Sequence, residues 1–294
     1  MRKPGSKSMS HRYAAGIIFT IPLIVVWCLL LVLPIGQTIY HSLTQWNGIK
    51  SAWIGFSSYQ RLLNDSTFWR VIANNGILLA SVPFAVLIPL VIAFLLNEKV
   101  TGWRVFRTIF FLPATVSWVV IGMVSLQFFI GEGILNHTFA ALGLGSVRQN
   151  MLASANLAII PVALTFVWSQ VGPNTLILLT GMATISPEIY GAAKMEGAGW
   201  WTLIWQITVP LLRRFLLFSL TITLIAAFTA LFSLIYVMTS GGPNYGTTTL
   251  EFFIYQRAFN QGQFGFGATL GVVLLIFMLI VSVFQFRFAR FAED

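Results

Sequence analysis

Residues 75–96 read NGILLASVPFAVLIPLVIAFLL, a run that contains no charged side chain. A helix of about 20 apolar residues crosses the hydrocarbon core of a bilayer, so this run predicts a transmembrane helix. Five more windows of comparable length and composition lie on either side of it. They are residues 13–40, 108–130, 157–179, 215–238 and 267–286. The sequence therefore predicts an all-α membrane protein with six transmembrane helices.

The overall composition agrees with a membrane protein. Hydrophobic residues make up 57% of the chain, charged residues only 9%, and the mean hydropathy is +0.84, whereas soluble domains carry about a quarter charged residues. A net charge of +9 would suggest nucleic acid as the partner of a soluble protein. Here the basic residues form short clusters between apolar runs, as membrane insertion requires. We therefore expect lipid and not nucleic acid as the surrounding partner.

The positions of the basic residues predict the orientation of the chain. Lys and Arg are retained on the cytoplasmic side of a membrane, and an inside N-terminus places most of the 17 basic residues there. The outside then receives Lys50, Arg61, Arg70, Arg148 and Arg257. This distribution predicts cytoplasmic tails at residues 1–12 and 287–294 and a membrane domain over residues 13–286.

Shorter features modify this six-helix plan. Residues 56–70 alternate polar and apolar side chains and predict an amphipathic helix on the outer membrane surface. Residues 134–144 are apolar but too short to span, which favours an interfacial or re-entrant helix. Gly172 and Pro173 predict a loosened fourth helix whose freed carbonyls face protein or a water-filled cavity.

The sequence lacks the groups that most membrane chemistry needs. None of the six windows contains Asp, Glu, Lys, Arg or His, so ion coupling is disfavoured, although a sodium site built from carbonyls stays open. The three histidines show no metal-ligand spacing, and no GxxxxGK[ST] phosphate loop occurs. We expect no catalytic residue, no metal and no cofactor in this chain, and any ATP and Mg²⁺ would be bound by a partner.

Neutral polar and aromatic residues within the spans are candidates for a solute path, since they can bond to and stack on an uncharged, hydroxyl-rich solute. The alternative is that they hydrogen-bond between helices, which membrane proteins use widely, and for any single residue this alternative is favoured. The candidates are Trp118, Gln127, Trp168, Gln170, Asn174, Thr229, Ser233 and Tyr236.

The longest segment on the predicted cytoplasmic side is residues 181–214, between the fourth and fifth windows. Ser186 is a suitable N-cap, Pro187 fits the first helical position, and Gly197 and Gly199 predict the end of that helix. Residues 200–209 then predict an amphipathic helix at the membrane surface. Small residues dominate the first helix and its turn, so another protein can approach its backbone closely.

This segment resembles the EAA motif of binding-protein-dependent ABC importer permeases, in the carbohydrate-uptake branch typified by the maltose and glycerol-phosphate permeases. The matching residues are Ala192, Ala193, Gly197, Ile207 and Pro210, with Glu196 and Ala198 in the motif's wider context. Gly191 stands where the motif has Glu, and Val209 where it has Leu. Residues 56–63, 106–113 and 239–247 also resemble this family.

The resemblance implies a permease subunit of an ATP-driven sugar or oligosaccharide importer in a bacterial or archaeal cytoplasmic membrane. Its expected partners are a second permease, two ATPase subunits and an extracytoplasmic solute-binding protein. The helix of the 181–214 loop would be the coupling helix, which docks on an ATPase, with Gly191, Ala192, Ala193, Glu196, Gly197 and Ala198 at the contact and Ile207 and Pro210 completing the motif. A non-transporting membrane scaffold and, third, an ion-coupled carrier remain as alternatives.

Overall fold

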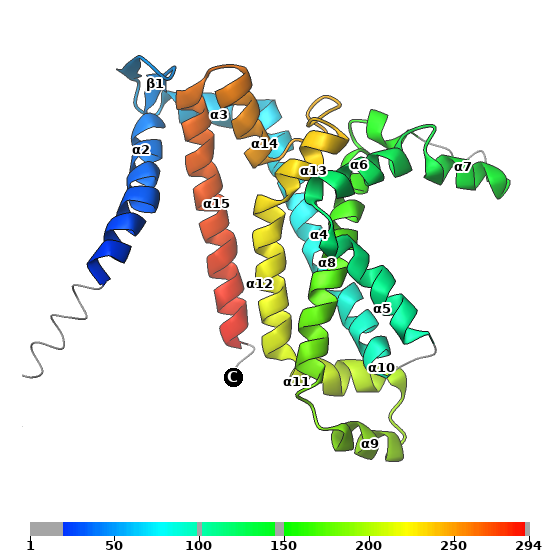
Figure 1. The fold of residues 1–294 in the computed structure, drawn as a ribbon. Helices are drawn as coiled ribbons and strands as arrows, with labels where there is room; N and C mark the ends of the chain where they lie inside the picture. Colours follow the sequence, from blue (N-terminus) through cyan, green and yellow to red (C-terminus); the bar gives the residue numbers. More distant parts are fainter. Residues whose placement is uncertain (1–19, 99–101, 145–149, 292–294) are drawn as a thin grey trace, which may run out of the picture. The chain divides into compact units, whose positions relative to one another are not determined.

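The computed structural model describes residues 20–98, 102–144 and 150–291. The predicted tail over residues 1–12, the start of the first span at 13–19 and the chain end at 292–294 lie outside the described residues. The described part is helical except for one short hairpin (Figure 1). Its strands β1 (Thr44–Trp46) and β2 (Ser51–Trp53) are antiparallel, with Gln45 opposite Ala52.

The helices follow one another through the chain with several short interruptions. In order they are η1 (Cys28–Val32), α2 (Leu33–His41), α3 (Ser57–Leu63), α4 (Ser66–Asn97), α5 (Trp103–Phe111), η2 (Leu112–Thr115), α6 (Trp118–Phe129), α7 (Ile134–Ala141), η4 (Met151–Ala153), α8 (Ile159–Met182), α9 (Pro187–Met195), α10 (Trp200–Thr202), η5 (Leu203–Thr208), α11 (Val209–Leu211), α12 (Arg213–Thr229), α13 (Leu231–Met238), α14 (Leu250–Tyr255), η6 (Gln256–Asn260) and α15 (Phe264–Phe291).

Length and composition identify five helical stretches able to cross a membrane. They are Thr20–His41, Ser66–Asn97, Trp118–Ala141, Ile159–Met182 and Phe264–Arg287. A sixth is obtained if Trp200–Leu211 and Arg213–Thr229, which meet at an angle of 80°, are counted as one broken span. The chain is therefore an all-helical membrane protein with five to six candidate spans.

Two predicted spans are wrong as single helices. The window at 108–130 is divided by η2, and α6 begins anew after Ser117, whose hydroxyl accepts a hydrogen bond from the Val120 N–H. The window at 215–238 is divided at Ala230, between α12 and α13. Hydropathy indicates burial in lipid but not the direction of the backbone, so it did not predict either helix break.

The shorter predicted features have mixed outcomes. The single helix expected over 56–70 is wrong because α3 ends at Leu63, and the Asp65 carboxylate caps α4 by accepting from the Thr67 N–H at 2.8 Å. The short separate helix expected within 134–144 is present as α7. At the other end of the chain, α15 continues to Phe291, beyond the predicted end of the last span.

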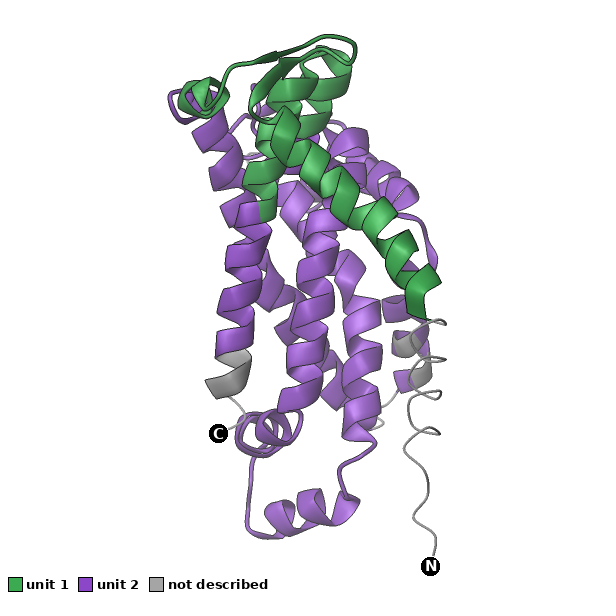
Figure 2. Cartoon of the chain, turned by 90° about the vertical axis from the view of Figure 1, so that its left-hand side faces the viewer, with its two compact units in different colours: residues 1–62, 254–275 green, residues 63–253, 276–294 purple. Residues whose placement is uncertain are grey.

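The chain forms two compact units, which Figure 2 colours separately. Unit 1 comprises residues 1–62 and 254–275, and unit 2 comprises residues 63–253 and 276–294. In unit 1 the hydroxyl of Thr269 on α15 donates to the Ser42 carbonyl at 3.0 Å, and the rings of His41 and Trp46 stack at 4.0 Å. Unit 2 contains the loop that carries the family resemblance.

The centre of unit 2 is a bundle of α4, α8 and α12 held by the amide of Asn174. Pro89 lies inside α4 and has no N–H, so the carbonyl of Ala85 lacks its helical donor. The Asn174 amide nitrogen donates to that carbonyl at 2.7 Å and to the Thr223 hydroxyl at 2.8 Å. Its oxygen accepts from Ser219 at 2.7 Å. One side chain on α8 thereby provides a donor for the freed carbonyl of α4 and joins α4 to α12.

The Gly172–Pro173 pair does not interrupt α8, so the predicted loosening of this helix is wrong, but Pro173, like Pro89, has no N–H for the carbonyl four residues before it. The helix runs without interruption from Ile159 to Met182 with Pro173 inside it. A Cβ on Gly172 would lie only 2.9 Å from the Phe110 carbonyl oxygen. The glycine is needed for close packing of α8 against the end of α5.

Candidate functional site

Helix α9 forms where local chemistry predicted it, at the lower edge of Figure 1. The Ser186 hydroxyl accepts a hydrogen bond from the Glu188 N–H at its start. At its end the Gly197 N–H bonds to the Lys194 carbonyl and the Ala198 N–H to the Ala193 carbonyl, at 3.1 and 2.9 Å. With Gly197 at φ +84°, these two bonds form a Schellman motif that ends the helix.

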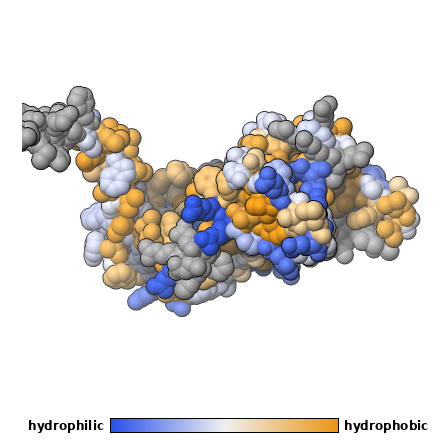
Figure 3. Space-filling view, turned by 90° about the horizontal axis from the view of Figure 1, so that it is seen from below, coloured by the Kyte–Doolittle hydropathy of each residue, from blue (hydrophilic) through white to orange (hydrophobic). Residues whose placement is uncertain are grey.

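The motif residues divide between two faces. Gly191, Ala192, Glu196, Gly197 and Pro210 are exposed. By contrast, Ala193, Ala198 and Ile207 pack against the hydrophobic cluster beneath the loop. Figure 3 views the molecule from this end and shows hydrophilic and hydrophobic residues side by side.

The exposed face of α9 also carries two apolar side chains that the motif did not single out. Met195 is 86% exposed and Ile189 is 42% exposed. Between them, a Cβ added to Gly191 would have no atom within 4 Å. The face is thus formed by small and apolar residues, with Glu188, Lys194 and Glu196 as exposed charged residues of the same helix, and it is suited to close approach by another protein.

A buried tyrosine fastens α9 to the transmembrane bundle. Tyr190 is only 7% exposed, and its hydroxyl shares a hydrogen bond with the Thr208 hydroxyl at 3.1 Å. The Tyr190 ring meets the Phe94 ring of α4 edge-on, with centroids 6.3 Å apart. Thr208 in turn donates to the Leu203 carbonyl at 2.8 Å. Helix α9, helix α4 and the segment after the glycine turn therefore meet in one cluster.

An ion pair makes a second link between α9 and α4. Lys194 Nζ lies 2.7 Å from Glu98 Oε2, and the two side chains are 48% and 31% exposed. Because water screens such a pair, its contribution to stability is roughly 0.2–1 kcal/mol. The sequence analysis missed Tyr190, Lys194, Phe94 and Glu98, because the link depends on two helices that are remote in sequence.

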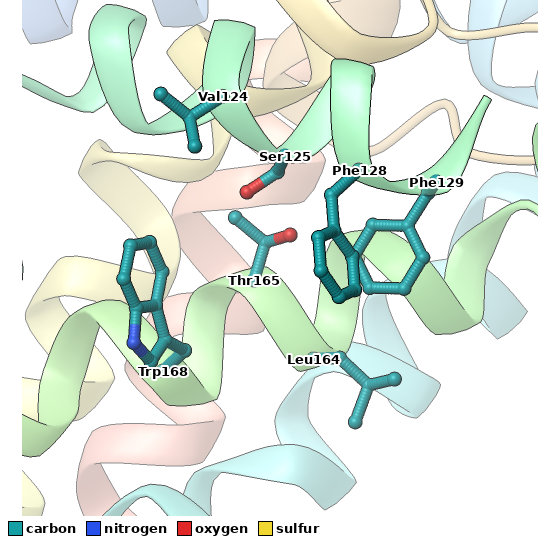
Figure 4. Close-up of a pocket in the computed structure, with 7 residues that line it drawn as sticks. All are labelled: Val124, Ser125, Phe128, Phe129, Leu164, Thr165 and Trp168. Atoms are coloured by element: carbon teal, nitrogen blue, oxygen red, sulfur yellow. The ribbon is translucent and has the colours of Figure 1, made fainter. Parts of the chain in front are cut away.

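A pocket of about 360 Å³ lies between α6 and α8 (Figure 4). Its lining residues are Val124, Ser125, Phe128, Phe129, Leu164, Thr165 and Trp168. The Thr165 hydroxyl is buried without a hydrogen-bond partner among the described residues. The pocket thus offers aromatic rings, two hydroxyls and no charge.

The predicted path residues do not gather in this pocket, which contains only Trp168 of the set. Trp118 stacks on Phe166 with centroids 6.3 Å apart, and Gln170 is buried with its amide nitrogen unpaired among the described residues. Asn174 has no exposed surface, and its amide makes hydrogen bonds within the α4–α8–α12 bundle.

The remaining path candidates lie elsewhere on α6, α12 and α13. Gln127 is exposed and Ser233 half-buried. Thr229 donates to the Ile225 carbonyl of its own helix at 2.9 Å, and Tyr236 stacks on Phe232 with centroids 6.0 Å apart. Ser125 and Thr165 are the pocket hydroxyls that the path set omitted, and only their facing positions on two helices distinguish them from other span hydroxyls.

One ionisable group outside the spans is strongly perturbed. Burial raises the pKa of Glu251 on α14 to about 7. Neither its carboxylate nor the Thr249 hydroxyl makes a hydrogen bond within the described residues. Over residues 20–98, 102–144 and 150–291, no group of three or more His, Cys, Asp or Glu side chains is placed to hold a metal ion.

Comparison with known proteins decides the family. Residues 70–293 match the family described as "Binding-protein-dependent transport system inner membrane component". The chain belongs to this family. The permease is 31% identical over 260 residues to the multiple sugar-binding transport system permease protein MsmF of Streptococcus mutans, covering 87% of this chain and 89% of the relative. It is 30% identical over 283 residues to the probable ABC transporter permease YurN of Bacillus subtilis, covering 94% and 96%.

A solved structure shares the fold of the permease. A chain of a bacterial ABC transporter for import of the acidic polysaccharide alginate superposes with a TM-score of 0.79 at 22% identity, covering 97% of both chains. The family assignment makes this chain a multi-pass inner-membrane subunit of an ABC transporter that works with a binding protein. It is a permease subunit and not itself an ATPase. The resemblance to this family that the sequence indicated is therefore confirmed.

Proposed function

We propose that this permease forms one half of the translocation path of an ATP-driven importer for an uncharged sugar or oligosaccharide. The observation that carries the proposal is α9, which presents the EAA-like residues on an exposed, glycine-terminated helix fastened to the bundle. In the proposed orientation both chain ends and α9 lie in the cytoplasm. A second permease completes the path, two ATPases power it, and a binding protein delivers the solute.

Helix α9 is the proposed coupling helix. Its exposed face of Gly191, Ala192, Glu196 and Gly197, extended by Met195, docks on the ATPase. Its other face, with Ala193 and Ala198, transmits the resulting force to the cluster below. Because the leading Glu of the motif is Gly191, the contact is apolar at this point and makes no ion pair through it.

The proposed solute path includes the pocket between α6 and α8. Trp168 and the two phenylalanines offer ring faces, and the unpaired Thr165 hydroxyl offers a hydrogen bond to a solute hydroxyl. Trp118, Gln127, Gln170, Thr229, Ser233 and Tyr236 are kept as further candidates. Asn174 is not, because its hydrogen bonds are used within the bundle. The absence of charged residues from the six apolar windows of the sequence supports an uncharged solute.

Affinity purification of the tagged chain from its own membrane separates the three candidate functions. An importer subunit brings down an ATPase and a second permease, and the reconstituted complex hydrolyses ATP faster when sugar-loaded binding protein is present. A scaffold brings down partners but shows no sugar-dependent hydrolysis or uptake. An ion-coupled carrier brings down neither partner, and its uptake needs an ion gradient.

Two variants test the assigned sites in that complex. Trp168→Ala should lower sugar uptake about tenfold, equivalent to ~1.4 kcal/mol of lost contact, while ATPase binding is kept. Ala192→Trp should release the ATPase because it places a bulky ring on the exposed face of α9. Trp69→Ala, at an exposed tryptophan outside the pocket, is the control and should change neither. Unchanged uptake in Trp168→Ala contradicts the pocket assignment.

A further inference from the structure

Two side chains of α9 meet two side chains of α4 in matching order. Tyr190 and Lys194 are one helical turn apart and share a face of α9, and Phe94 and Glu98 are related in the same way at the end of α4. Tyr190 contacts Phe94, and Lys194 pairs with Glu98. The Glu98 N–H also bonds to the Phe94 carbonyl at 3.0 Å, so Phe94 and Glu98 lie on one helical turn.

The two contacts differ in how easily they open. Tyr190 is buried, hydrogen-bonded and packed in the cluster, so separating it from Phe94 exposes apolar surface and orphans a hydroxyl. The Lys194–Glu98 pair is exposed, so each side chain can exchange the other for water at little cost in free energy. Since Lys194 lies about 6 Å along the helix from Tyr190, a small tilt of α9 about Tyr190 is enough to part the two charges.

We propose that Lys194 and Glu98 form a switchable ion pair that sets the angle of α9 against α4 in one state of the transport cycle and opens in the other. The pair is present in this structure, with Tyr190 as the fixed point of the tilt. Both residues are positioning residues, because their assigned role is to set the angle of α9. An interaction made in only one of two states shifts the population toward that state. The inference rests on the proposed function and extends it from the docking face of α9 to its membrane-facing side.

The test measures sugar molecules imported per ATP hydrolysed by the whole complex in proteoliposomes. Lys194→Gln and Glu98→Gln should each lower this ratio about threefold, with at most a small decrease in apparent Tm because the pair is exposed. Lys194→Arg keeps the charge and should keep the ratio. The charge-swapped double variant Lys194→Glu with Glu98→Lys should recover most of it. Glu188→Gln removes an exposed carboxylate from the same helix and serves as the matched control.

The dependence of this ratio on salt concentration separates a switching role from a merely structural one. The screening length falls from about 10 Å at ~0.1 M salt to about 3 Å at ~1 M, so the wild-type ratio should fall toward that of the variants as salt rises. The ratios of Lys194→Gln and Glu98→Gln should stay level.

The outcomes are distinguishable. A wild-type ratio retained by both single variants, or a swap that recovers nothing, overturns the ion-pair inference alone. A lowered Tm with an unchanged ratio also overturns it, because it shows a purely structural contact. Absence of ATP-dependent uptake by the wild-type complex overturns the proposed function, and the inference with it.

Discussion

The α4–α8–α12 bundle and helix α9 use polar groups in opposite ways. In the bundle, Asn174 uses both amide hydrogens and its oxygen on neighbours and has no exposed surface. On α9, Gly191 and Ala192 have almost no side chain, and the ion pair of Lys194 faces water. The bundle is thus fixed by buried hydrogen bonds, whereas α9, in the function proposed above, meets a partner and tilts about one buried anchor, Tyr190.

The largest effect should come from breaking the bundle at Asn174. Asn174→Leu keeps the volume but leaves the Ala85 carbonyl and the Ser219 hydroxyl unpaired in an apolar interior, which costs about 2 kcal/mol each. We expect a loss of about 4 kcal/mol, measured as a lowered apparent Tm in detergent. Thr180→Ala is the control, because that exposed hydroxyl bonds only to the Leu176 carbonyl of its own helix.

The same measurement locates the cause of that loss. Pro89→Ala restores an N–H opposite the Ala85 carbonyl, so the double variant with Asn174→Leu should lose less than Asn174→Leu alone. An equal loss in Asn174→Leu and Thr180→Ala would contradict the role assigned to the amide.

Glu251 sharpens the comparison because it is buried yet lacks the hydrogen bonds that Asn174 has. Its pKa is raised from 4.5 to about 7 in the folded chain, so between these values the folded state holds the proton more tightly than the unfolded state. The contribution of Glu251 to stability is therefore most favourable at low pH, falls as pH rises through this window, and levels off above it. Glu251→Gln should remove this fall and stabilise the chain at pH 8 by up to about 3 kcal/mol.

The pH profile of apparent Tm checks this prediction. Wild type and Glu251→Gln should coincide near pH 5 and diverge toward pH 8, with the variant higher. Parallel profiles over that range would show that Glu251 titrates normally. Glu188→Gln, which changes an exposed carboxylate on α9, is the control and should leave the profile unaltered.

The smallest effects, of opposite sign, are expected at two glycines of α9. Gly197 has φ +84°, a conformation that costs a residue with a Cβ roughly 1–2 kcal/mol, so Gly197→Ala should destabilise the end of the helix. Gly191 is inside the helix with open space around it, and Gly191→Ala should stabilise it by up to about 1 kcal/mol. Hydrogen exchange of the α9 amides measures both, and two shifts of the same sign would contradict the assignment.

Hydropathy predicted the helices that run without interruption. The window at 75–96 lies within α4, the window at 267–286 lies within α15, and the window at 157–179 overlaps α8 from Ile159 onward. An uncharged apolar run has few other stable conformations in a membrane. The break at η2 has a local sign in Pro113 and in the Ser117 cap. The break at Ala230 has none, because alanine favours helix.

The site was predictable where its chemistry is local. The cap at Ser186 and the αL glycine at 197 are properties of neighbouring residues, and both occur as expected. Asn174 was grouped with solute-path candidates because a sequence cannot reveal that its amide faces a carbonyl freed by Pro89 on another helix. The pairing of Lys194 with Glu98 is non-local in the same way.

The contact between Asn174 and the carbonyl freed by Pro89 also makes the two positions unequal under substitution. Asn174 has partners in Thr223 and Ser219 whether or not a proline is present, so replacing Pro89 leaves the asparagine hydrogen-bonded. Replacing Asn174 while the proline remains leaves the Ala85 carbonyl without its donor. The dependence therefore runs in one direction, from the proline to the asparagine.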